Sequence, residues 1–291
     1  MQLESPLILA SGILDENGYT MRRILEEGAA AVVTKSIGTT ERPGFTPPVV
    51  AELGENLLNA IGLSNPGIEH FAGEISIAKG IGKPVIGSIF GASAEEFSML
   101  ASKMESYGAD AIELNLSCPH VKGFGSEVGS DPDLVEEIVT EVKAKVGVPV
   151  FAKLTPNVTD IVKIAKAAEK ADALVLINTV KAIHIDIYAR RPTLSNAYGG
   201  LSGPAIKPIG VRAVYDVYRE TSKEIIGSGG ISNFEDVIEY MMAGARAVEI
   251  GTALKAAGRA IFDNIKRDII RFMEADRLDG IQEIIGAGVT R

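Results

Sequence analysis

Eight short apolar runs, spread along the whole chain, limit what this sequence can fold into more than any other feature. Continuous runs rich in Val, Ile and Leu are typical of strands buried on both faces, as in parallel sheets. The pattern therefore predicts eight parallel strands. The runs lie at residues 6–11, 31–37, 85–90, 111–116, 149–154, 173–179, 224–230 and 247–252.

Segments with helical periodicity lie between most of these runs. Ser93 and Glu96 form a capping box ahead of a helix that ends at Gly108, and Asp131 is placed to cap a helix whose first residue is Pro132. Strands that alternate with helices over 291 residues predict an α/β fold, a (β/α)8 or TIM barrel. A doubly wound open sheet is the alternative that this alternation leaves open. Further helical patterns span 158–170, 205–220, 233–243 and 255–274.

Two connections between the predicted strands stand out. No shift in composition marks a domain boundary, so we expect residues 1–291 to form a single domain. Residues 38–65 form a long connection that is rich in Pro and Gly and lacks helical periodicity, and such connections are usually binding loops or lids. A second, glycine-rich connection at 117–130 contains Cys118, the only cysteine of the chain. We expect both segments to be active-site loops.

Polar residues and glycines stand at the carboxyl ends of the apolar runs. In a (β/α)8 barrel the active site lies at this end of the strands. Any single strand end meets water and tolerates a polar residue, but eight such ends together indicate a ligand site. The residues are Ser11, Lys35, Ser36, Ser88, Asn115, Lys153, Asn178, Thr179, Gly229, Gly230, Gly251 and Thr252.

The chemistry of these strand ends leaves several functions open. The last two runs end in Gly-Gly and Gly-Thr pairs, where backbone N–H groups can approach a phosphate, although glycines also serve tight turns. Lys35 and Lys153 follow the second and fifth runs, and a lysine in a barrel mouth can form a Schiff base, bind a carboxylate or stabilise a cofactor anion. A phosphate-binding lyase or isomerase that uses Lys153, a redox enzyme and a non-catalytic ligand-binding barrel all remain possible.

Composition excludes several classes of protein. A net charge of −9 argues against nucleic-acid binding, which needs a basic surface. One cysteine excludes an internal disulfide and a four-thiolate iron–sulfur cluster, and three scattered histidines argue against a metal site. Residues 123–129 lack the glycine spacing of a dinucleotide fingerprint, so a redox role requires a bound flavin or an outside electron carrier. No signal peptide or membrane-spanning run is visible, so we expect a cytoplasmic protein without membrane contact.

Several segments resemble the dihydroorotate dehydrogenases, and the match covers nearly the whole chain. The resemblance implies an FMN-containing TIM barrel that oxidises dihydroorotate to orotate in pyrimidine (UMP) biosynthesis. The segments are ASG (10–12), VVTKSIG (32–38), NAIGLSNPG (59–67), ELNLSCPHVKGFG (113–125), FAKLTPNVTDI (151–161), INTV (177–180), GGLSGPAIKP (199–208) and IIGSGGISNFEDV (225–237).

The segments at 113–125 and 199–208 are similar to the class 1B branch of this family. That branch passes electrons from FMN to NAD through a separate subunit that carries FAD and a two-iron, two-sulfur cluster. On this resemblance we expect a homodimer within a heterotetramer that contains such a subunit. A related dihydropyrimidine oxidoreductase, or a class 1A enzyme that reduces fumarate, is the nearest alternative.

The resemblance also implies roles for individual residues. Cys118 matches the catalytic base that removes a proton from C5 of dihydroorotate, and Lys153 matches a catalytic lysine beside the flavin ring. The other implied flavin contacts are Ser11, Lys35, Ser36, Ser88, Asn115, Ile177, Gly203, Gly229, Gly230, Gly251 and Thr252. The implied substrate contacts are Lys35, Asn59, Ala60, Ile61, Gly62, Leu63, Asn115, Asn178 and Thr179.

Two positions depart from the family pattern. His120 stands two residues after the proposed base, where asparagine is usual, and its charge can change near neutral pH. Ser88 replaces a flavin-contacting asparagine, and its shorter side chain is expected to lose that contact or make it through water. Neither departure removes a reacting group.

Overall fold

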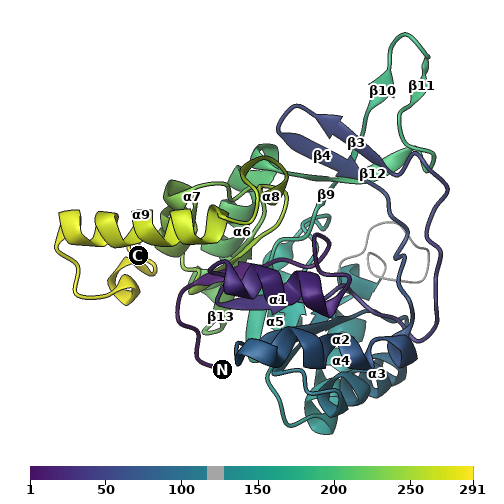
Figure 1. The fold of residues 1–291 in the computed structure, drawn as a ribbon, viewed down its shortest axis with the longest axis horizontal. Helices are drawn as coiled ribbons and strands as arrows, with labels where there is room; N and C mark the ends of the chain where they lie inside the picture. The colour runs from purple at the N-terminus through teal and green to yellow at the C-terminus, as the bar shows by residue number, and fades with distance from the viewer. Residues whose placement is uncertain (117–127, 291) are drawn as a thin grey trace.

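The computed structural model describes residues 1–116 and 128–290, and its central feature is a closed barrel of parallel strands (Figure 1). The order around the barrel is β1-β14-β13-β8-β7-β6-β5-β2, and β1 closes it by pairing Leu7 with Val248 and Ile8 with Ala31. All of these strands lie within the predicted runs, so the (β/α)8 barrel is confirmed and the open sheet was the wrong alternative. Their bounds are Leu7–Leu9 (β1), Ala31–Val33 (β2), Val85–Ile89 (β5), Ala111–Asn115 (β6), Val150–Lys153 (β7), Ala173–Leu176 (β8), Glu224–Ser228 (β13) and Ala247–Ile250 (β14).

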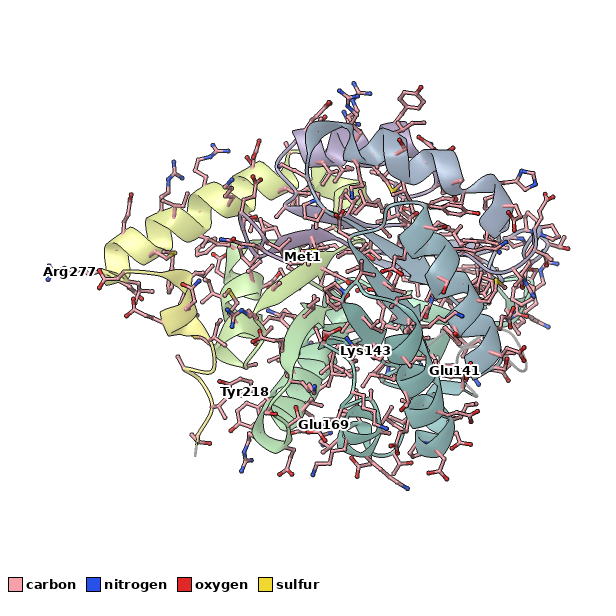
Figure 2. All side chains as sticks on the ribbon, turned by 90° about the horizontal axis from the view of Figure 1, so that it is seen from below. Met1, Glu141, Lys143, Glu169, Tyr218 and Arg277 are labelled. Atoms are coloured by element: carbon pink, nitrogen blue, oxygen red, sulfur yellow. The ribbon has the colours of Figure 1, made fainter. Side chains whose placement is uncertain are left out.

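Helices surround the barrel and turn apolar faces toward it. On α4 the buried side chains include Val135, Ile138 and Val142, whereas Glu141 and Lys143 lie on its outer side (Figure 2). The helices are Gly18–Glu26 (α1), Ala72–Ala78 (α2), Ala94–Ser106 (α3), Pro132–Lys145 (α4), Ile161–Ala167 (α5), Lys207–Glu220 (α6), Phe234–Met242 (α7), Leu254–Ala257 (α8) and Ile261–Asp276 (α9). Short 3-10 turns span Ile68–His70, Lys79–Ile81, Val128–Ser130, Pro204–Ile206 and Ile281–Ile284.

The helix ends agree with the sequence in part. Ser93 caps α3 by accepting a hydrogen bond from the backbone N–H of Glu96, but the Glu96 carboxylate accepts from the N–H of Ala92 instead of completing a capping box. Asp131 caps α4 as expected. The single helix expected at 255–274 is two helices, because Gly258, with φ +65°, ends α8 before α9 begins.

The barrel interior is layered. The layer nearer the amino ends of the strands is apolar. Because side chains on a strand alternate between faces, the residue two positions further along also points into the barrel. On five strands that next inward residue is polar. The apolar layer is Ile8, Ala31, Val33, Ile86, Ala111, Phe151, Ala173, Val175, Ile226 and Ala247. The polar residues above it are Ser88, Glu113, Lys153, Ser228 and Glu249, all buried.

A small antiparallel sheet lies beyond the carboxyl ends of the barrel strands. Its order is β3-β4-β12-β9, and Gly200 of β12 pairs with Asn59 of β4. The connection at 38–65 therefore contains a β-hairpin, which pairs with a second excursion after β8. Figure 1 shows the β10–β11 hairpin projecting from this end of the molecule. The bounds are Val50–Leu53 (β3), Asn56–Asn59 (β4), Val180–Ile183 (β9), Ile185–Asp186 (β10), Arg191–Pro192 (β11) and Tyr198–Ser202 (β12).

Candidate active site

Two adjoining cavities open at the carboxyl ends of the barrel strands. The first measures about 360 Å³ and lies at the ends of β8, β13 and β14, and the second measures about 270 Å³ and lies at the ends of β1, β2 and β6. Ligand pockets commonly measure about 300–1,000 Å³, so the two together suit a cofactor with a small substrate. Residues that line both are Ser11, Lys153, Asn178, Thr179, Ser202, Gly251 and Thr252.

Glycines form part of the wall of the first cavity. Gly230 follows β13 with φ +75°, and a Cβ atom there would lie 2.7 Å from Cβ of Lys207 and 2.9 Å from the carbonyl oxygen of Gly203. Below this turn, the Tyr240 hydroxyl lies 2.7 Å from the carbonyl oxygen of Gly229 and donates to it. Backbone held in this way at strand ends is suited to receive a phosphate.

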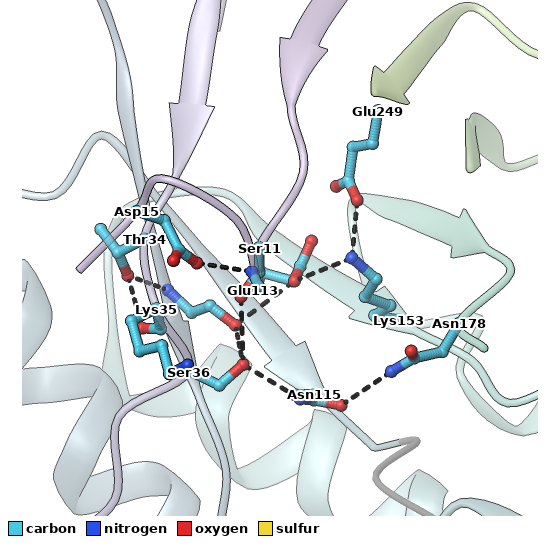
Figure 3. Close-up of polar contacts among 12 residues, drawn as sticks. Ser11, Asp15, Thr34, Lys35, Ser36, Glu113, Asn115, Lys153, Asn178 and Glu249 are labelled. Atoms are coloured by element: carbon cyan, nitrogen blue, oxygen red, sulfur yellow. Dashed lines mark hydrogen bonds and ion pairs between the residues drawn. The ribbon is translucent and has the colours of Figure 1, made fainter. Parts of the chain in front are cut away.

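Polar side chains joined by hydrogen bonds form one part of the wall of the second cavity (Figure 3), and apolar residues form another part. The amide of Asn178 donates to Oδ1 of Asn115 at 3.4 Å, and the amide of Asn115 donates to the Ser36 hydroxyl at 3.0 Å. The hydroxyls of Ser36 and Ser88 are 2.9 Å apart. This chain of hydrogen bonds joins the ends of β8, β6 and β2 to β5 and fixes the orientation of each amide group.

Lys153 lies between the two cavities and is almost completely buried. Its Nζ is 2.6 Å from Oε2 of Glu249 and 3.5 Å from Oε1 of Glu113. Burial alone would lower the pKa of Lys153, but the two carboxylates outweigh it and raise that pKa above its ordinary value. Lys153 is therefore a cation at neutral pH. Burial, followed by the charge of Glu249, raises the pKa of Glu113 well above its ordinary value, and Lys153 opposes that shift.

Lys35 borders the second cavity from the end of β2. Its Nζ is 3.7 Å from Oε1 of Glu16, whose side chain is largely exposed. The backbone N–H of Lys35 donates to the carbonyl of Asp15 at 3.1 Å, and the Asp15 carboxylate accepts from the N–H of Gly12 at 2.5 Å. Burial raises the pKa of Asp15, against the pull of Lys35. These contacts tie the loop after β1 to the lysine.

Most of the predicted site residues that the structure describes line one of the two cavities. Ser88 and Ala60 are buried and border neither, and Ser88 instead supports Ser36 from below. Cys118 and His120 lie outside the described residues. The first cavity takes in Ser11, Lys153, Ile177, Asn178, Thr179, Gly203, Gly229, Gly230, Gly251 and Thr252. The second takes in Ser11, Lys35, Ser36, Asn59, Ile61, Gly62, Leu63, Asn115, Lys153, Asn178, Thr179, Gly251 and Thr252.

Sequence reasoning missed several residues of the site, among them Glu113, Glu249 and Ser202. Glu113 and Glu249 line the second and first cavities, and Ser202 accepts a hydrogen bond from the Thr252 hydroxyl at 2.8 Å. The signal for the two glutamates was a charged residue inside an otherwise apolar run. Within residues 1–116 and 128–290, no group of three or more His, Cys, Asp or Glu side chains could hold a metal ion. In the same residues, no helix is long and apolar enough to cross a membrane.

Comparison with known proteins adds the family. A family model described as dihydroorotate dehydrogenase matches residues 1–273. The chain belongs to the dihydroorotate dehydrogenase family. A dihydroorotate dehydrogenase B (NAD(+)) catalytic subunit from Thermoplasma volcanium is 65% identical over 291 residues, which is 100% of this chain and 97% of the relative. A protein of the same name from Pyrococcus horikoshii is 51% identical over 288 residues, covering 98% of this chain and 94% of the relative.

A solved structure supports the fold of this dihydroorotate dehydrogenase family member. A crystal structure of DHODH from Eimeria tenella in complex with ferulenol matches with a TM-score of 0.84. The match covers 99% of this chain and 86% of the other. Because the two sequences are 20% identical, this likeness bears on the barrel and not on the ligands.

Proposed function

We propose that this chain is the catalytic subunit of a class 1B dihydroorotate dehydrogenase, which oxidises dihydroorotate to orotate with FMN in pyrimidine biosynthesis. The observation that carries the proposal is the pair of cavities that meet at Lys153, one bordered by the glycine turn after β13 and the other bordered in part by amide and hydroxyl side chains. The two relatives at 65% and 51% identity, both named as NAD-linked catalytic subunits, support the same activity.

The described residues fit FMN. A side chain at Gly230 would collide with Lys207 and Gly203, so the turn after β13 presents bare backbone to the first cavity, as a phosphate close to the backbone requires. We propose that the phosphate end is held by Gly229, Gly230, Gly251 and Thr252, and that Lys153 lies beside the ring. When bound, FMN supplies the two-electron acceptor for the oxidation. A fixed cation such as Lys153 stabilises negative charge that develops nearby.

The second cavity fits the substrate. Dihydroorotate carries a ring imide and a carboxylate, and these groups need hydrogen-bond donors, acceptors and a cation. Asn59, Asn115 and Asn178 present amide groups to this cavity, and Lys35 borders it. A site built to hydrogen-bond its substrate rejects analogues that leave its buried polar groups unpaired. We therefore infer that these residues orient dihydroorotate and select it.

We propose Cys118 as the base that takes the C5 proton. A thiol with an ordinary pKa of about 8.5 becomes an effective base where its surroundings favour the thiolate. Cys118 itself is outside the described residues, but the chain just before its loop reaches the second cavity. Asn115 lines the second cavity, and Gly129, after the loop, packs against the carbonyl oxygen of Leu116.

The remaining parts of the proposal concern partners. This chain has a single cysteine, so a two-iron, two-sulfur cluster would be held by a different subunit, together with FAD and the NAD site. We infer a homodimer inside a heterotetramer with that subunit, in the cytoplasm. We also propose that residues 1–291 act as a single domain in which 38–65 and 117–130 are active-site loops.

The charge of Lys153 argues against the alternative of a Schiff-base lyase or isomerase. A Schiff base requires a neutral amine, and such lysines have a lowered pKa. Two buried carboxyl groups next to Lys153 instead raise its pKa and hold it protonated. Lys153 is suited to electrostatic stabilisation rather than to nucleophilic attack.

The test is purification of the chain alone, identification of any released cofactor by mass spectrometry, and turnover with dihydroorotate and three rival acceptors. We expect bound FMN, fast turnover with an artificial dye and poor turnover with NAD or fumarate. Protein that binds no flavin would contradict the proposed function. Brisk NAD reduction without a partner would overturn the two-subunit proposal, and fast fumarate reduction would move the chain to the class 1A branch.

A further inference from the structure

Three ionisable side chains meet inside the barrel beneath the cavities, each from a different strand (Figure 3). Lys153 of β7 lies between Glu249 of β14 at 2.6 Å and Glu113 of β6 at 3.5 Å. The three side chains are 6%, 1% and 0% exposed, in that order. Glu249 borders the first cavity, Glu113 borders the second, and Lys153 borders both. We call these three residues the carboxyl–lysine cluster.

The charges of this cluster do not balance if both carboxyl groups are ionised. Two carboxylates and one ammonium leave one negative charge in excess, and an uncompensated buried charge is strongly destabilising. One oxygen of each carboxyl group, Oε2 of Glu113 and Oε1 of Glu249, is buried without a hydrogen-bond partner in the described structure. A single proton on the pair removes the excess charge and turns one carboxyl oxygen into a donor.

The groups that act on Glu113 come from the neighbouring strands and from β14. They are the Lys153 ammonium on β7, the Glu249 carboxylate on β14 and the Ser88 hydroxyl on β5, which lies 3.3 Å from Oε1 of Glu113. Burial and the charge of Glu249 favour a proton on Glu113, and Lys153 and Ser88 oppose it. Lys153 is closer to Glu249 than to Glu113, so Glu249 is the better placed of the two to carry the negative charge.

We propose that Glu113 carries a proton at neutral pH, so that the buried carboxyl–lysine cluster between the two cavities has no net charge. Each of the two carboxyl groups can then replace the other as the counter-charge of Lys153. Removal of either glutamate leaves one carboxylate to balance Lys153, whereas removal of both leaves an uncompensated positive charge. This consequence rests on the proposed function where it concerns a flavin in the cavities.

The first test detects the proton on Glu113 without any catalysis. Difference infrared spectra of the purified protein are compared for the wild type, Glu113→Gln, Glu249→Gln and the control Glu224→Gln, whose surface carboxylate pairs with Arg246. We expect the C=O band of a protonated carboxyl group at neutral pH in the wild type and in the control, and its loss in both cluster variants. Absence of the band from the wild type, or its survival in both cluster variants, would overturn the proposal.

The second test measures the reduction potential of the bound flavin. Glu113→Gln and Glu249→Gln should each shift the FMN midpoint potential little. The double variant should have a midpoint potential at least about 30 mV higher, which is a tenfold change in the reduction equilibrium constant of a two-electron couple. The proposal would be refuted if the double variant had the wild-type potential. It would also be refuted if the shifts of the two single variants added up to the shift of the double variant. Failure of the wild type to bind FMN would instead refute the proposed function and leave the infrared result standing.

Discussion

The two cavities of the site are built in different ways. Around Gly229 and Gly230 the first cavity offers backbone that is supported from below by Tyr240, and a ligand there meets peptide groups in fixed positions. The second cavity offers the side chains of Ser36, Asn115 and Asn178, joined by hydrogen bonds. A wall of backbone is sensitive to added volume, whereas a wall of side chains is sensitive to altered hydrogen bonding. The first arrangement suits the invariant phosphate of a cofactor, and the second suits recognition of one substrate.

The largest expected effect is on the rate of flavin reduction in Cys118→Ala, which should change without a loss of cofactor binding. Cys118→Ala should retain FMN and bind orotate, because the proposed role of the thiol is proton transfer and not binding. Flavin reduction by dihydroorotate should fall by about two to four orders of magnitude, the usual size of a general-base contribution. Rapid-mixing absorbance measurements under anaerobic conditions check this. Cys118→Ser should be slow and recover in part at high pH, and near-normal reduction by the alanine variant would remove Cys118 as the base.

The next effect tests the backbone wall of the first cavity. In Gly230→Ala the new Cβ would meet backbone atoms of Lys207 and Gly203, at a φ of +75° that costs about 1–3 kcal/mol for a non-glycine residue. We expect FMN affinity to fall by about tenfold or more, measured by fluorescence titration of the apoprotein. Gly73→Ala is the matched control, since its position in α2 is open and its φ is not positive. Equal FMN affinities in the two variants would contradict a backbone-built wall.

The carboxyl–lysine cluster predicts a pH dependence of stability. The pKa of Glu113 is raised above its ordinary 4.5, so above that pH the folded state keeps a proton that the unfolded state has lost. The free energy of unfolding should therefore contain a part that decreases as pH rises above 4.5, by up to about 1.4 kcal/mol per pH unit. Urea unfolding at a series of pH values should show a flatter profile for Glu113→Gln than for the wild type. A profile identical to that of the wild type would show that Glu113 is not protonated.

The smallest effect concerns the support below the first cavity. Tyr240→Phe removes only the hydroxyl that donates to the carbonyl oxygen of Gly229 at 2.7 Å and lies 3.1 Å from that of Ser228. We expect a loss of about 1–2 kcal/mol in stability and a several-fold weaker binding of FMN, with substrate contacts unchanged. The control is Tyr215→Phe, whose hydroxyl bonds Thr290 on the surface. Unchanged FMN affinity in Tyr240→Phe would mean that the turn keeps its shape without this support.

The sequence predicted the barrel because burial on both faces produces continuous apolar runs. The small sheet was not predicted, because its strands are half exposed and its pairs are distant, as for Asn59 and Gly200, which are 141 positions apart. Most of the site could be predicted from the polar residues at the carboxyl ends of the strands, because these ends lie at the same face of the barrel. Glu113 and Glu249 were missed because each was read as part of an apolar run, and only the closed barrel shows that both face Lys153.

One anaerobic titration shows whether the two cavities hold a flavin and dihydroorotate in contact. Purified protein with its bound flavin is mixed with increasing dihydroorotate while the flavin absorbance and the orotate formed are both followed. We expect bleaching of the flavin with one orotate formed for each FMN reduced, and no bleaching by orotate itself. A flavin that stays oxidised in excess dihydroorotate would show that the two cavities do not carry out this reaction.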